Sequence, residues 1–265
     1  MKKKRVVLIG LLIILVVGLI GCFSLMYLSN NYEEVEQVVS LVEEQETLEK
    51  DFTSAGYTIE NPNVILNPYQ ISPLTALVIF ETEEEVAPRV TIVGKDEHST
   101  FTHEFESSTI HYLPIYGLYA GRENEIIIEY GDVSKPITIK TEELPEDFIL
   151  PTSVKANKKE LSNDLYFFTP SSSGYTCAYD VNGDVRWYLN INALWEINRL
   201  DNGHLMVSTE RLVNSPYYMT GLYEMDLLGK IYKEISLEGG YHHDYFLMPN
   251  GNLLVASDNF SSGYG

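Results

Sequence analysis

The amino-acid sequence predicts an all-β protein, in which an immunoglobulin-like β-sandwich is followed by the first blades of a β-propeller and preceded by a membrane-anchor helix. Three observations support this fold class. An uncharged apolar run lies near the N-terminus, short β-type segments follow at even spacing, and two turn motifs then recur after 46 and 48 residues. The chain has 265 residues, of which 45% are hydrophobic and 12% aromatic, so it can fold into more than one compact unit.

The anchor is predicted over residues 1–28. Four basic residues at positions 2–5 precede an apolar run over residues 6–28, and its 23 residues are long enough to cross a bilayer as a helix. Because positive charge stays inside, the rest of the chain is expected to be extracytoplasmic. Within the run, LIGC at 19–22 resembles a bacterial lipoprotein cleavage box, whose Cys22 would carry lipid. The run stays apolar after this cysteine, so a single-pass anchor in the cell membrane is favoured over a lipid anchor.

The outward part of the chain is strongly acidic. Four of the 18 basic residues precede the apolar run, which leaves 14 against 38 acidic residues and a formal charge of −24. Such a surface excludes binding of nucleic acid or anionic lipid through bulk electrostatics, and any anion must be held by local groups. Past the apolar run the one cysteine is Cys177, which excludes an intrachain disulfide there and is interpreted as a small core residue.

Residues 29–54 are predicted to form an acidic helical stalk. Val35, Val38, Val39 and Val42 recur at helical spacing, with glutamates between them. The run is short for a coiled coil that binds a partner, so a stalk next to the membrane is the favoured interpretation.

Residues 55–145 are predicted to form the sandwich. Runs rich in β-branched and aromatic residues alternate with Gly, Pro and Asn, at 75–82, 89–94, 101–106, 110–119, 124–130 and 136–144. Even spacing of this kind is typical of a small antiparallel immunoglobulin-like sandwich. His98, His103 and His111 fall here without a metal-ligand spacing to a cysteine or a carboxylate pair, so they are interpreted as surface or cross-strand residues.

The predicted propeller part, residues 146–265, contains an internal repeat. YDVNGDVRWYL at 179–189 is echoed by YEMDLLGKIYKEI at 223–235, each with an aspartate three residues before a glycine. RLDNGHLMVST at 199–209 is likewise echoed by LMPNGNLLVAS at 247–257. This period matches one four-stranded blade, in which an Asn-Gly turn joins two strands and an Asp-x-x-Gly turn joins the next two.

The number of repeats raises a physical difficulty for a propeller. A single blade cannot bury both of its faces, and a closed ring needs at least four blades, whereas the residues after Pro151 supply about two. Either partner chains complete the ring, or the sequence is the N-terminal part of a longer protein, which is the favoured interpretation.

Two adjacent histidines distinguish the second repeat from the first. When the repeats are aligned on their Asn-Gly glycines, His242 stands where the first repeat has Leu194, and His243 stands where it has Trp195. A repeat that needs only packing would keep apolar residues there, so the exchange indicates a site near the central channel, where propellers commonly bind ligands. The alternative is a histidine without a chemical role, whose ring is satisfied by a neighbouring carboxylate such as Asp244 or Asp258.

The geometry of a strand limits what these residues can do together. If residues 242–244 continue a strand, only one of the two histidines can face the channel, because side chains alternate. Three consecutive strand residues cannot converge on one ion, so a metal site formed by His242, His243 and Asp244 is not expected, and no cofactor is assigned.

Three passages resemble the bacterial aryl-sulfate sulfotransferases that do not use the PAPS donor. NPYQISPLTALVIFET, with VTIVGKD and HYLPIYGLYAGRENEIIIEY after it, is similar to the N-terminal sandwich of that family. YDVNGDVRWYL resembles the opening of its propeller, and YHHDYFLMPNGNLL resembles one of its histidine-bearing blades. The resemblance covers nearly all of the chain after residue 55.

The resemblance implies a six-bladed propeller enzyme on the outer side of a membrane, which transfers a sulfuryl group from a phenolic sulfate ester to a phenol. It also implies a ping-pong mechanism through a sulfohistidine on a later blade than any present here. The first histidine of the family's site maps onto YHHD. Accordingly His242 or His243, with His242 preferred, is expected to bind the sulfuryl group or to act as acid or base on the phenolic oxygen. A homodimer is left open.

The departures from the family pattern are equally specific. The later histidines and the site arginine have no counterpart here, and Arg186, Arg199 and Arg211 cannot be assigned to that role. The 265-residue chain by itself is therefore expected to be catalytically inactive. The alternative function is a membrane-tethered, extracytoplasmic propeller that serves as a non-catalytic binding or scaffolding module. A folded variant without both histidines discriminates the two, because an enzyme loses turnover and a scaffold loses stability or partner binding.

Overall fold

The computed structural model describes residues 40–171, 174–214 and 218–258, which in these ranges form an all-β structure with one short α-helix. Leu41–Gly265 forms one compact unit. The predicted anchor over residues 1–28 lies outside the described residues. Within the described ranges, no helix combines the length and the apolar character that crossing a membrane requires.

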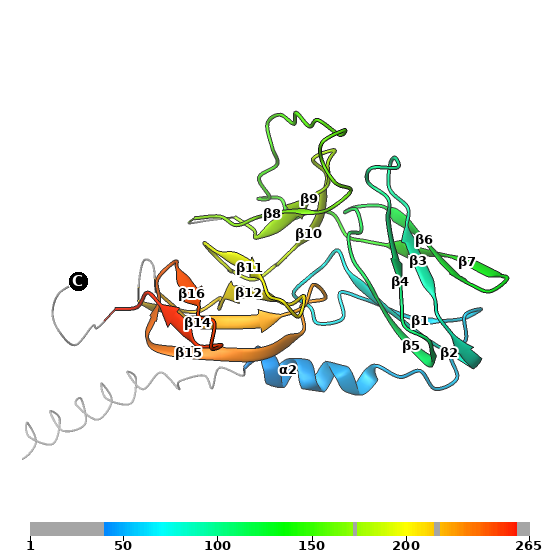
Figure 1. Ribbon diagram of the computed structural model, residues 1–265, viewed down its shortest axis with the longest axis horizontal. Helices are drawn as coiled ribbons and strands as arrows, with labels where there is room; N and C mark the ends of the chain where they lie inside the picture. The colour runs from blue at the N-terminus through cyan, green and yellow to red at the C-terminus, as the bar shows by residue number, and fades with distance from the viewer. Residues whose placement is uncertain (1–39, 172–173, 215–217, 259–265) are drawn as a thin grey trace, which may run out of the picture. The chain divides into compact units, whose positions relative to one another are not determined.

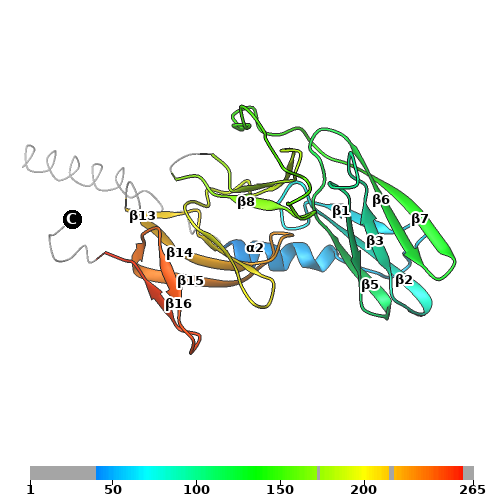
Figure 2. The same cartoon turned by 45° about the horizontal axis from the view of Figure 1, so that its top comes forward.

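Seven strands form two antiparallel sheets that pack face to face as a β-sandwich (Figure 2). The sheets have the strand orders β1-β2-β5 and β4-β3-β6-β7. The strands are β1 (Asn63–Leu66), β2 (Ala76–Val86), β3 (Arg89–Ile92), β4 (Phe101–Glu104), β5 (Ser108–Ile115), β6 (Glu123–Tyr130) and β7 (Val133–Lys140). The sequence predicts all of them except β1, whose four residues lie between Pro62 and Pro68.

Strand β5 shows how the sandwich forms its core. Side chains alternate along the strand, so Leu113 and Ile115 are buried, whereas Ile110 and Tyr112 are exposed. The buried residues join one apolar core to which both sheets contribute, as expected for aligned sheets that pack through their inner faces.

The sandwich histidines hold the positions that the sequence predicts for them. His111 is a buried cross-strand residue, whose ring stacks on that of its β2 partner Phe80 at a centroid distance of 4.6 Å. Its Nε2 lies 3.0 Å from the hydroxyl oxygen of Thr82. Burial lowers the pKa of His111, so its ring is neutral at pH 7. His103 is exposed, and His98 is half-buried in a loop.

The remaining strands form three further antiparallel sheets (Figure 1). The first is β10-β9-β8, the second contains β11, β12, β14 and β15 side by side with β13 against β14, and the third is the pair β16-β17. Their bounds are β8 (Tyr166–Phe168), β9 (Cys177–Tyr179), β10 (Val185–Tyr188), β11 (Ile197–Arg199), β12 (Leu205–Ser208), β13 (Leu212–Asn214), β14 (Tyr218–Met225), β15 (Ile231–Tyr241), β16 (Tyr245–Leu247) and β17 (Leu253–Val255). Cys177 is buried as predicted, and burial raises the pKa of its thiol.

The two Asp-x-x-Gly segments adopt the same turn. In each, the aspartate N–H donates to the carbonyl oxygen four residues later, and the glycine N–H donates back to the aspartate carbonyl, at distances from 2.9 to 3.1 Å. The turn needs a left-handed residue, which is Gly183 (φ 79°) between β9 and β10 and Gly229 (φ 92°) between β14 and β15. Asp180 and Asp226 also accept a backbone N–H with one carboxylate oxygen.

The two Asn-Gly segments are also structurally equivalent. Gly203 (φ 86°) lies between β11 and β12, and Gly251 (φ 82°) lies between β16 and β17. The side-chain oxygens of Asn202 and Asn250 each accept the backbone N–H two residues later, at 3.0 and 3.1 Å. The sequence repeat is therefore a repeat of strand-turn-strand units in space. Closure of such units into a propeller ring stays a prediction.

Helix α2 (Leu41–Leu48) packs along strand β15 and is followed by the 3₁₀ turn η1 (Glu49–Asp51) (Figure 1). Gln45 is buried, and its side-chain amide donates to the carbonyl of Gly229 and accepts the N–H of Ile231, both at 2.7 Å. Leu41 and Val42 pack against the apolar core beneath the sheet. These residues of the predicted stalk are thus part of the compact unit, whereas Val35, Val38 and Val39 lie outside the described residues.

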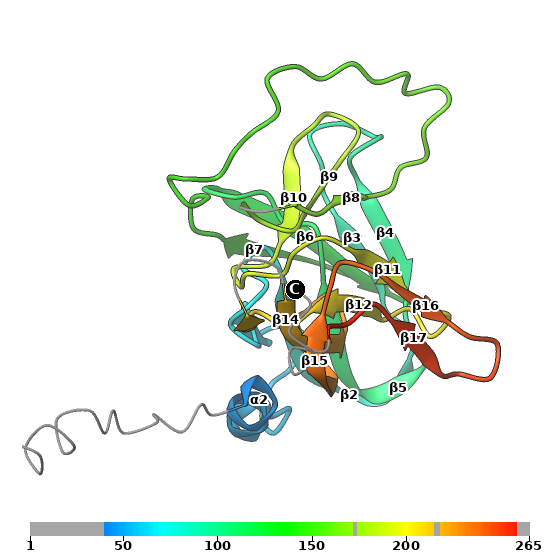
Figure 3. The ribbon, with the colours of Figure 1, turned by 90° about the vertical axis from the view of Figure 1, so that its left-hand side faces the viewer.

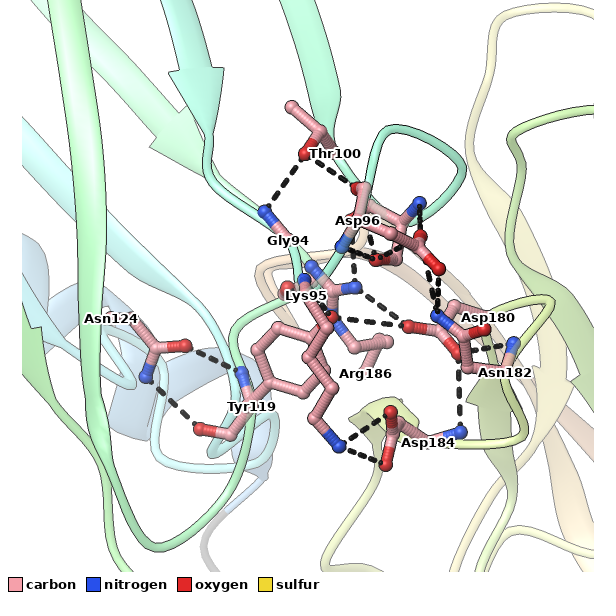
Figure 4. A network of polar contacts seen from close by, with 12 residues as sticks. Gly94, Lys95, Asp96, Thr100, Tyr119, Asn124, Asp180, Asn182, Asp184 and Arg186 are labelled. Atoms are coloured by element: carbon pink, nitrogen blue, oxygen red, sulfur yellow. Dashed lines mark hydrogen bonds and ion pairs between the residues drawn. The ribbon is translucent and has the colours of Figure 1, made fainter.

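A buried arginine joins the β9–β10 hairpin to the sandwich (Figure 4). Arg186, on β10, is fully buried and pairs with Asp180 at 2.8 Å. Its guanidinium also donates to the carbonyls of Gly117 and Ser99, at 2.7 and 2.9 Å, and lies over the ring of Tyr119 at 3.8 Å. Because the two carbonyls belong to sandwich loops, these bonds fix the hairpin against the sandwich.

Candidate active site

The predicted site histidines occupy a sharp corner between two strands. Strand β15 ends at Tyr241 and β16 begins at Tyr245, so His242 and His243 lie outside any strand. His243 has a left-handed backbone (φ 50°), and the N–H of Asp244 donates to the carbonyl of His242 at 2.8 Å. A left-handed histidine is uncommon, so the surrounding hydrogen bonds must hold it in place.

The same corner occurs in the first repeat. Trp195 is also left-handed (φ 69°), and the N–H of Glu196 donates to the carbonyl of Leu194 at 3.1 Å. The sequence alignment that places His242 on Leu194 and His243 on Trp195 therefore holds in the backbone.

Backbone bonds to β17 and its extension fix the histidine corner. The N–H of His242 donates to the carbonyl of Ala256 at 3.0 Å, and the N–H of Ala256 donates to the carbonyl of Asp244 at 3.1 Å. Figure 3 shows the β16–β17 hairpin beside the end of β15. These backbone hydrogen bonds hold the residues that carry the two imidazoles in a defined position.

The side chains at the two corners differ in what they touch. In the first repeat, Leu194 is buried, and the Trp195 indole donates to the carbonyl of Ser171 at 2.9 Å. In the second, the ring of His242 stacks on that of Tyr218 at 4.8 Å, and the ring of His243 is exposed.

The two imidazoles are neighbours, with ring centroids 4.2 Å apart. The prediction that strand alternation turns only one of His242 and His243 toward the site does not apply, because neither residue belongs to a strand. Because His243 itself is left-handed (φ 50°), the chain turns at this residue rather than continuing as a strand, and the two rings lie side by side.

Buried phenols lie below the corner. Tyr241 is fully buried, and its hydroxyl donates to a carboxylate oxygen of Glu196 at 3.5 Å, while Asn198 donates to the other oxygen at 2.6 Å. Burial and the nearby Glu196 charge raise the pKa of Tyr241, and burial raises the pKa of Tyr245 to about 12. Both phenols therefore keep their protons at neutral pH.

The three arginines left unassigned by sequence have distinct surroundings. Arg186 belongs to the buried network with Asp180. Arg211 pairs with Glu234 and lies 3.5 Å from a carboxylate oxygen of Glu210. Arg199 lines two cavities described below, and neither cavity is lined by His242 or His243.

Sequence reasoning also missed one histidine. His204, in the first Asn-Gly turn, lies 2.7 Å from a carboxylate oxygen of Glu224 and stacks on Tyr232 at 4.2 Å. The partner is 20 residues away in sequence, so no local pattern marks the pair. Among residues 40–171, 174–214 and 218–258, no group of three His, Cys, Asp or Glu side chains is arranged to hold a metal ion.

The fold and the site define an all-β protein in which a sandwich precedes repeated antiparallel sheets. Two imidazoles stand at the corner where the first repeat has the apolar residues Leu194 and Trp195. The chain belongs to the arylsulfotransferase family. Residues 63–144 match the arylsulfotransferase Ig-like domain, and residues 151–264 match the arylsulfotransferase (ASST) domain. The predicted family and the immunoglobulin-like character of the sandwich are confirmed.

The chain is also similar, at low sequence identity, to a curated protein of the same family. An arylsulfate sulfotransferase, AssT, from Lelliottia amnigena is 21% identical over 257 residues, which cover 72% of this chain and 42% of that protein. The chain therefore spans less than half the length of the curated relative that it matches.

Proposed function

We propose that this protein transfers a sulfuryl group from a phenolic sulfate ester to a phenol, and that His242 and His243 act in that transfer. Membership of the arylsulfotransferase family supports aryl sulfotransferase function in general. The observation that carries the assignment of residues is the pair of adjacent imidazole rings, 4.2 Å apart, at a corner where the preceding repeat has a leucine and a tryptophan.

Neutral imidazoles suit this chemistry because each ring offers one N–H donor and one lone pair. A donor can bind a sulfuryl oxygen or protonate the departing phenolic oxygen, and a lone pair can accept the proton of the incoming phenol. His243 is exposed and can meet a substrate, whereas stacking on Tyr218 restricts the ring of His242. The sequence favours His242 for the direct contact with substrate; on the exposure of the two rings we instead assign that contact to His243, with His242 as its neighbour in the site.

In the proposed ping-pong sequence, an imidazole nitrogen forms a bond to sulfur while the ester S–O bond breaks. The phenolate leaves with that electron pair and takes a proton from an acid group. In the second half, the oxygen of the acceptor phenol bonds to sulfur, the S–N bond breaks, and the phenolic proton passes to a base. By analogy with the family, a different histidine is the nucleophile, and His242 and His243 bind the sulfuryl group or move the proton.

Turnover of 4-nitrophenyl sulfate with phenol as acceptor tests the proposal, using the complete reading frame that encodes this chain. We expect His242→Ala and His243→Ala each to lower kcat by roughly 10²- to 10⁴-fold, the usual effect of losing a proton-transfer group. His98→Ala, which removes a histidine from a sandwich loop, is the control and should leave turnover unchanged. Circular dichroism and thermal unfolding establish that each variant is folded.

Two outcomes would count against this assignment. Wild-type turnover in the His242→Ala/His243→Ala double variant would remove both residues from the reaction. Loss of folding without loss of turnover per folded molecule would give the pair a structural role, as in the scaffolding alternative.

We further propose that the apolar run over residues 6–28 anchors the protein with the remaining chain on the extracytoplasmic side. The support is the charge and length of that run in the sequence. Protease treatment of intact cells should cleave a tag placed at the C-terminus, and a protected tag would contradict this orientation.

A further inference from the structure

A large cavity lies where the sandwich meets the β11–β12 hairpin. Its volume is about 720 Å³, which is within the range of small-molecule sites. Strands β3 and β4 and the residues around β5 line one side, and residues from β8, β11 and β12 line the other. The wall is mainly apolar and aromatic, and includes Phe101, Phe105, Tyr116, Tyr166, Phe167 and Ile197.

A second cavity of about 690 Å³ continues from the first. The two share Pro114, Tyr116, Arg199, Gly203 and Leu227 in their linings, so they meet at these residues. We call the two together the junction groove. Tyr116, which both cavities share, is half-buried, and burial raises the pKa of its phenol.

Among the basic side chains that line the junction groove, Arg199 differs from Lys230 and His204 in having no acidic partner within the described residues. In the part of the chain that the structure describes, Arg199 is exposed and its guanidinium has no hydrogen bond or ion pair. By contrast, Lys230 pairs with Glu49, and His204 pairs with Glu224.

Two carboxylates that line the groove, Asp226 and Asp164, do not compete for Arg199. Asp226 accepts the hydroxyl of Tyr232 at 3.2 Å and two backbone N–H groups, so it is already satisfied. Asp164 lines only the first cavity, whereas Arg199 lines both. An anionic group therefore has a favourable position where the two cavities meet, at Arg199.

We propose that the junction groove binds a planar aromatic anion, with its ring on the apolar wall and its acidic group on Arg199. Such a wall contributes affinity through burial of the ring, and the guanidinium fork selects a carboxylate or a sulfonate-type oxyanion. The formal charge of −24 in the chain after the apolar run gives no long-range attraction for an anion, so the local guanidinium must supply it. This site is separate from the histidine corner and does not rest on the proposed sulfotransfer.

Direct binding measurements test the proposal. The probe is naphthalene-2-sulfonate, whose C–S bond is not a transferable ester, and it is titrated into the full chain by calorimetry. Naphthalene-2-methanol is the neutral aromatic comparison, and methanesulfonate is the anion without a ring. We expect saturable one-to-one binding of the sulfonate that is at least about tenfold tighter than that of either comparison.

Matched variants identify the site. Arg199→Gln should weaken naphthalene-2-sulfonate binding about tenfold or more and leave the neutral probe unaffected, while Arg199→Lys should retain part of the affinity. Arg89→Gln removes another exposed arginine that lines neither cavity, and binding should be unchanged. The His242→Ala/His243→Ala variant should also bind as wild type, which separates this result from the fate of the sulfotransfer proposal.

Several results would overturn the inference. Equal binding of the neutral and anionic aromatics would show that Arg199 selects nothing. An equal loss in Arg89→Gln and Arg199→Gln would reduce the effect to net charge. Loss of binding in the double histidine variant alone would place the ligand at the histidine corner instead.

Discussion

At the scale of single residues, Arg186 is notable because its buried side chain bonds both the β9–β10 hairpin and the sandwich. Removing two charges from water is expensive, and a buried pair is retained only when further hydrogen bonds satisfy it. Two nitrogens of Arg186 are satisfied by Asp180 and two backbone carbonyls, whereas its Nη2 atom has no hydrogen bond within the described residues and the guanidinium lies over the ring of Tyr119. The pair is six residues apart in sequence, but the two carbonyls come from the sandwich, so one side chain connects both parts of the compact unit.

We therefore expect Arg186→Met to lower the free energy of unfolding by about 3–5 kcal/mol, because it leaves the carboxylate of Asp180 buried without its partner. Urea unfolding followed by tryptophan fluorescence measures the change. Lys95→Met, which breaks the exposed pair with Asp184, is the control and should cost less than about 1 kcal/mol. Equal costs for the two variants would contradict the structural role of burial.

The left-handed backbone at His243 gives a second prediction at this scale. Glycine adopts a positive φ without steric cost, so His243→Gly should leave the free energy of unfolding unchanged or raise it by up to about 1 kcal/mol. His243→Val should lower it by about 1 kcal/mol or more, because a β-branched residue resists this conformation. In contrast, His103→Gly on strand β4 should lower it by about 0.5–1 kcal/mol. A loss of stability in His243→Gly comparable to that in His103→Gly would mean that the ring itself stabilises the fold.

At the scale of elements, the turns define the repeat more clearly than the strands do. The strands vary in length from three to eleven residues, while each type of turn keeps its hydrogen bonds and its left-handed glycine in both copies. A turn is encoded by a few adjacent residues whose backbone conformation is restricted. Strand length also depends on which neighbours are available for pairing, which adjacent residues do not specify.

The glycines of these turns should respond differently to alanine. At Gly251 a Cβ atom would meet nothing within 4 Å, so Gly251→Ala should cost only the strain of a positive φ, about 1 kcal/mol. At Gly229 a Cβ atom would lie 2.6 Å from the Cγ1 atom of Ile71, so Gly229→Ala should cost more. Urea unfolding of both variants checks the difference. A cost for Gly251→Ala equal to or above that for Gly229→Ala would show that packing around Ile71 is not limiting.

At the scale of the whole molecule, carboxyl groups whose pKa changes on folding make stability depend on pH. Contacts with His204 and Asn202 lower the pKa of Glu224 from its usual value of 4.5. This contribution to stability is complete above pH 4.5 and is lost as the pH falls through the lowered value in the folded state. Asp226 acts in the opposite sense, because burial raises its pKa, so its contribution is complete below its usual value of 3.8 and is lost as the pH rises.

We expect the urea midpoint to fall as the pH is lowered from 6 toward 3, and Glu224→Gln to reduce this fall. The pair lies near the surface, so the change should be below about 1 kcal/mol and should shrink at high salt. Glu238→Gln, at an exposed glutamate, should keep the wild-type pH dependence. If Glu224→Gln showed an undiminished fall, the pair with His204 would not contribute to acid stability.

Much of the fold can be predicted from sequence because its signals are local. Alternating apolar residues predict strands such as β2, β5 and β6, and the Asp-x-x-Gly and Asn-Gly spacings predict the turns of the repeat. The alignment of those turns also places His243 on Trp195, and their shared left-handed backbone bears out that correspondence. The adjacency of the two imidazoles could not be predicted, because strand alternation was assumed where the chain instead turns.

The sequence by itself determined the all-β class, the family, the two kinds of turn and the position of the histidines in the repeat, because each depends on residues close together in the chain. Only the tertiary structure decided that Arg186 binds sandwich carbonyls, that Gln45 docks helix α2 on β15, and that Arg199 lies where two cavities meet. These features join residues from distant segments, and their hydrogen bonds and burial exist only once the segments have packed.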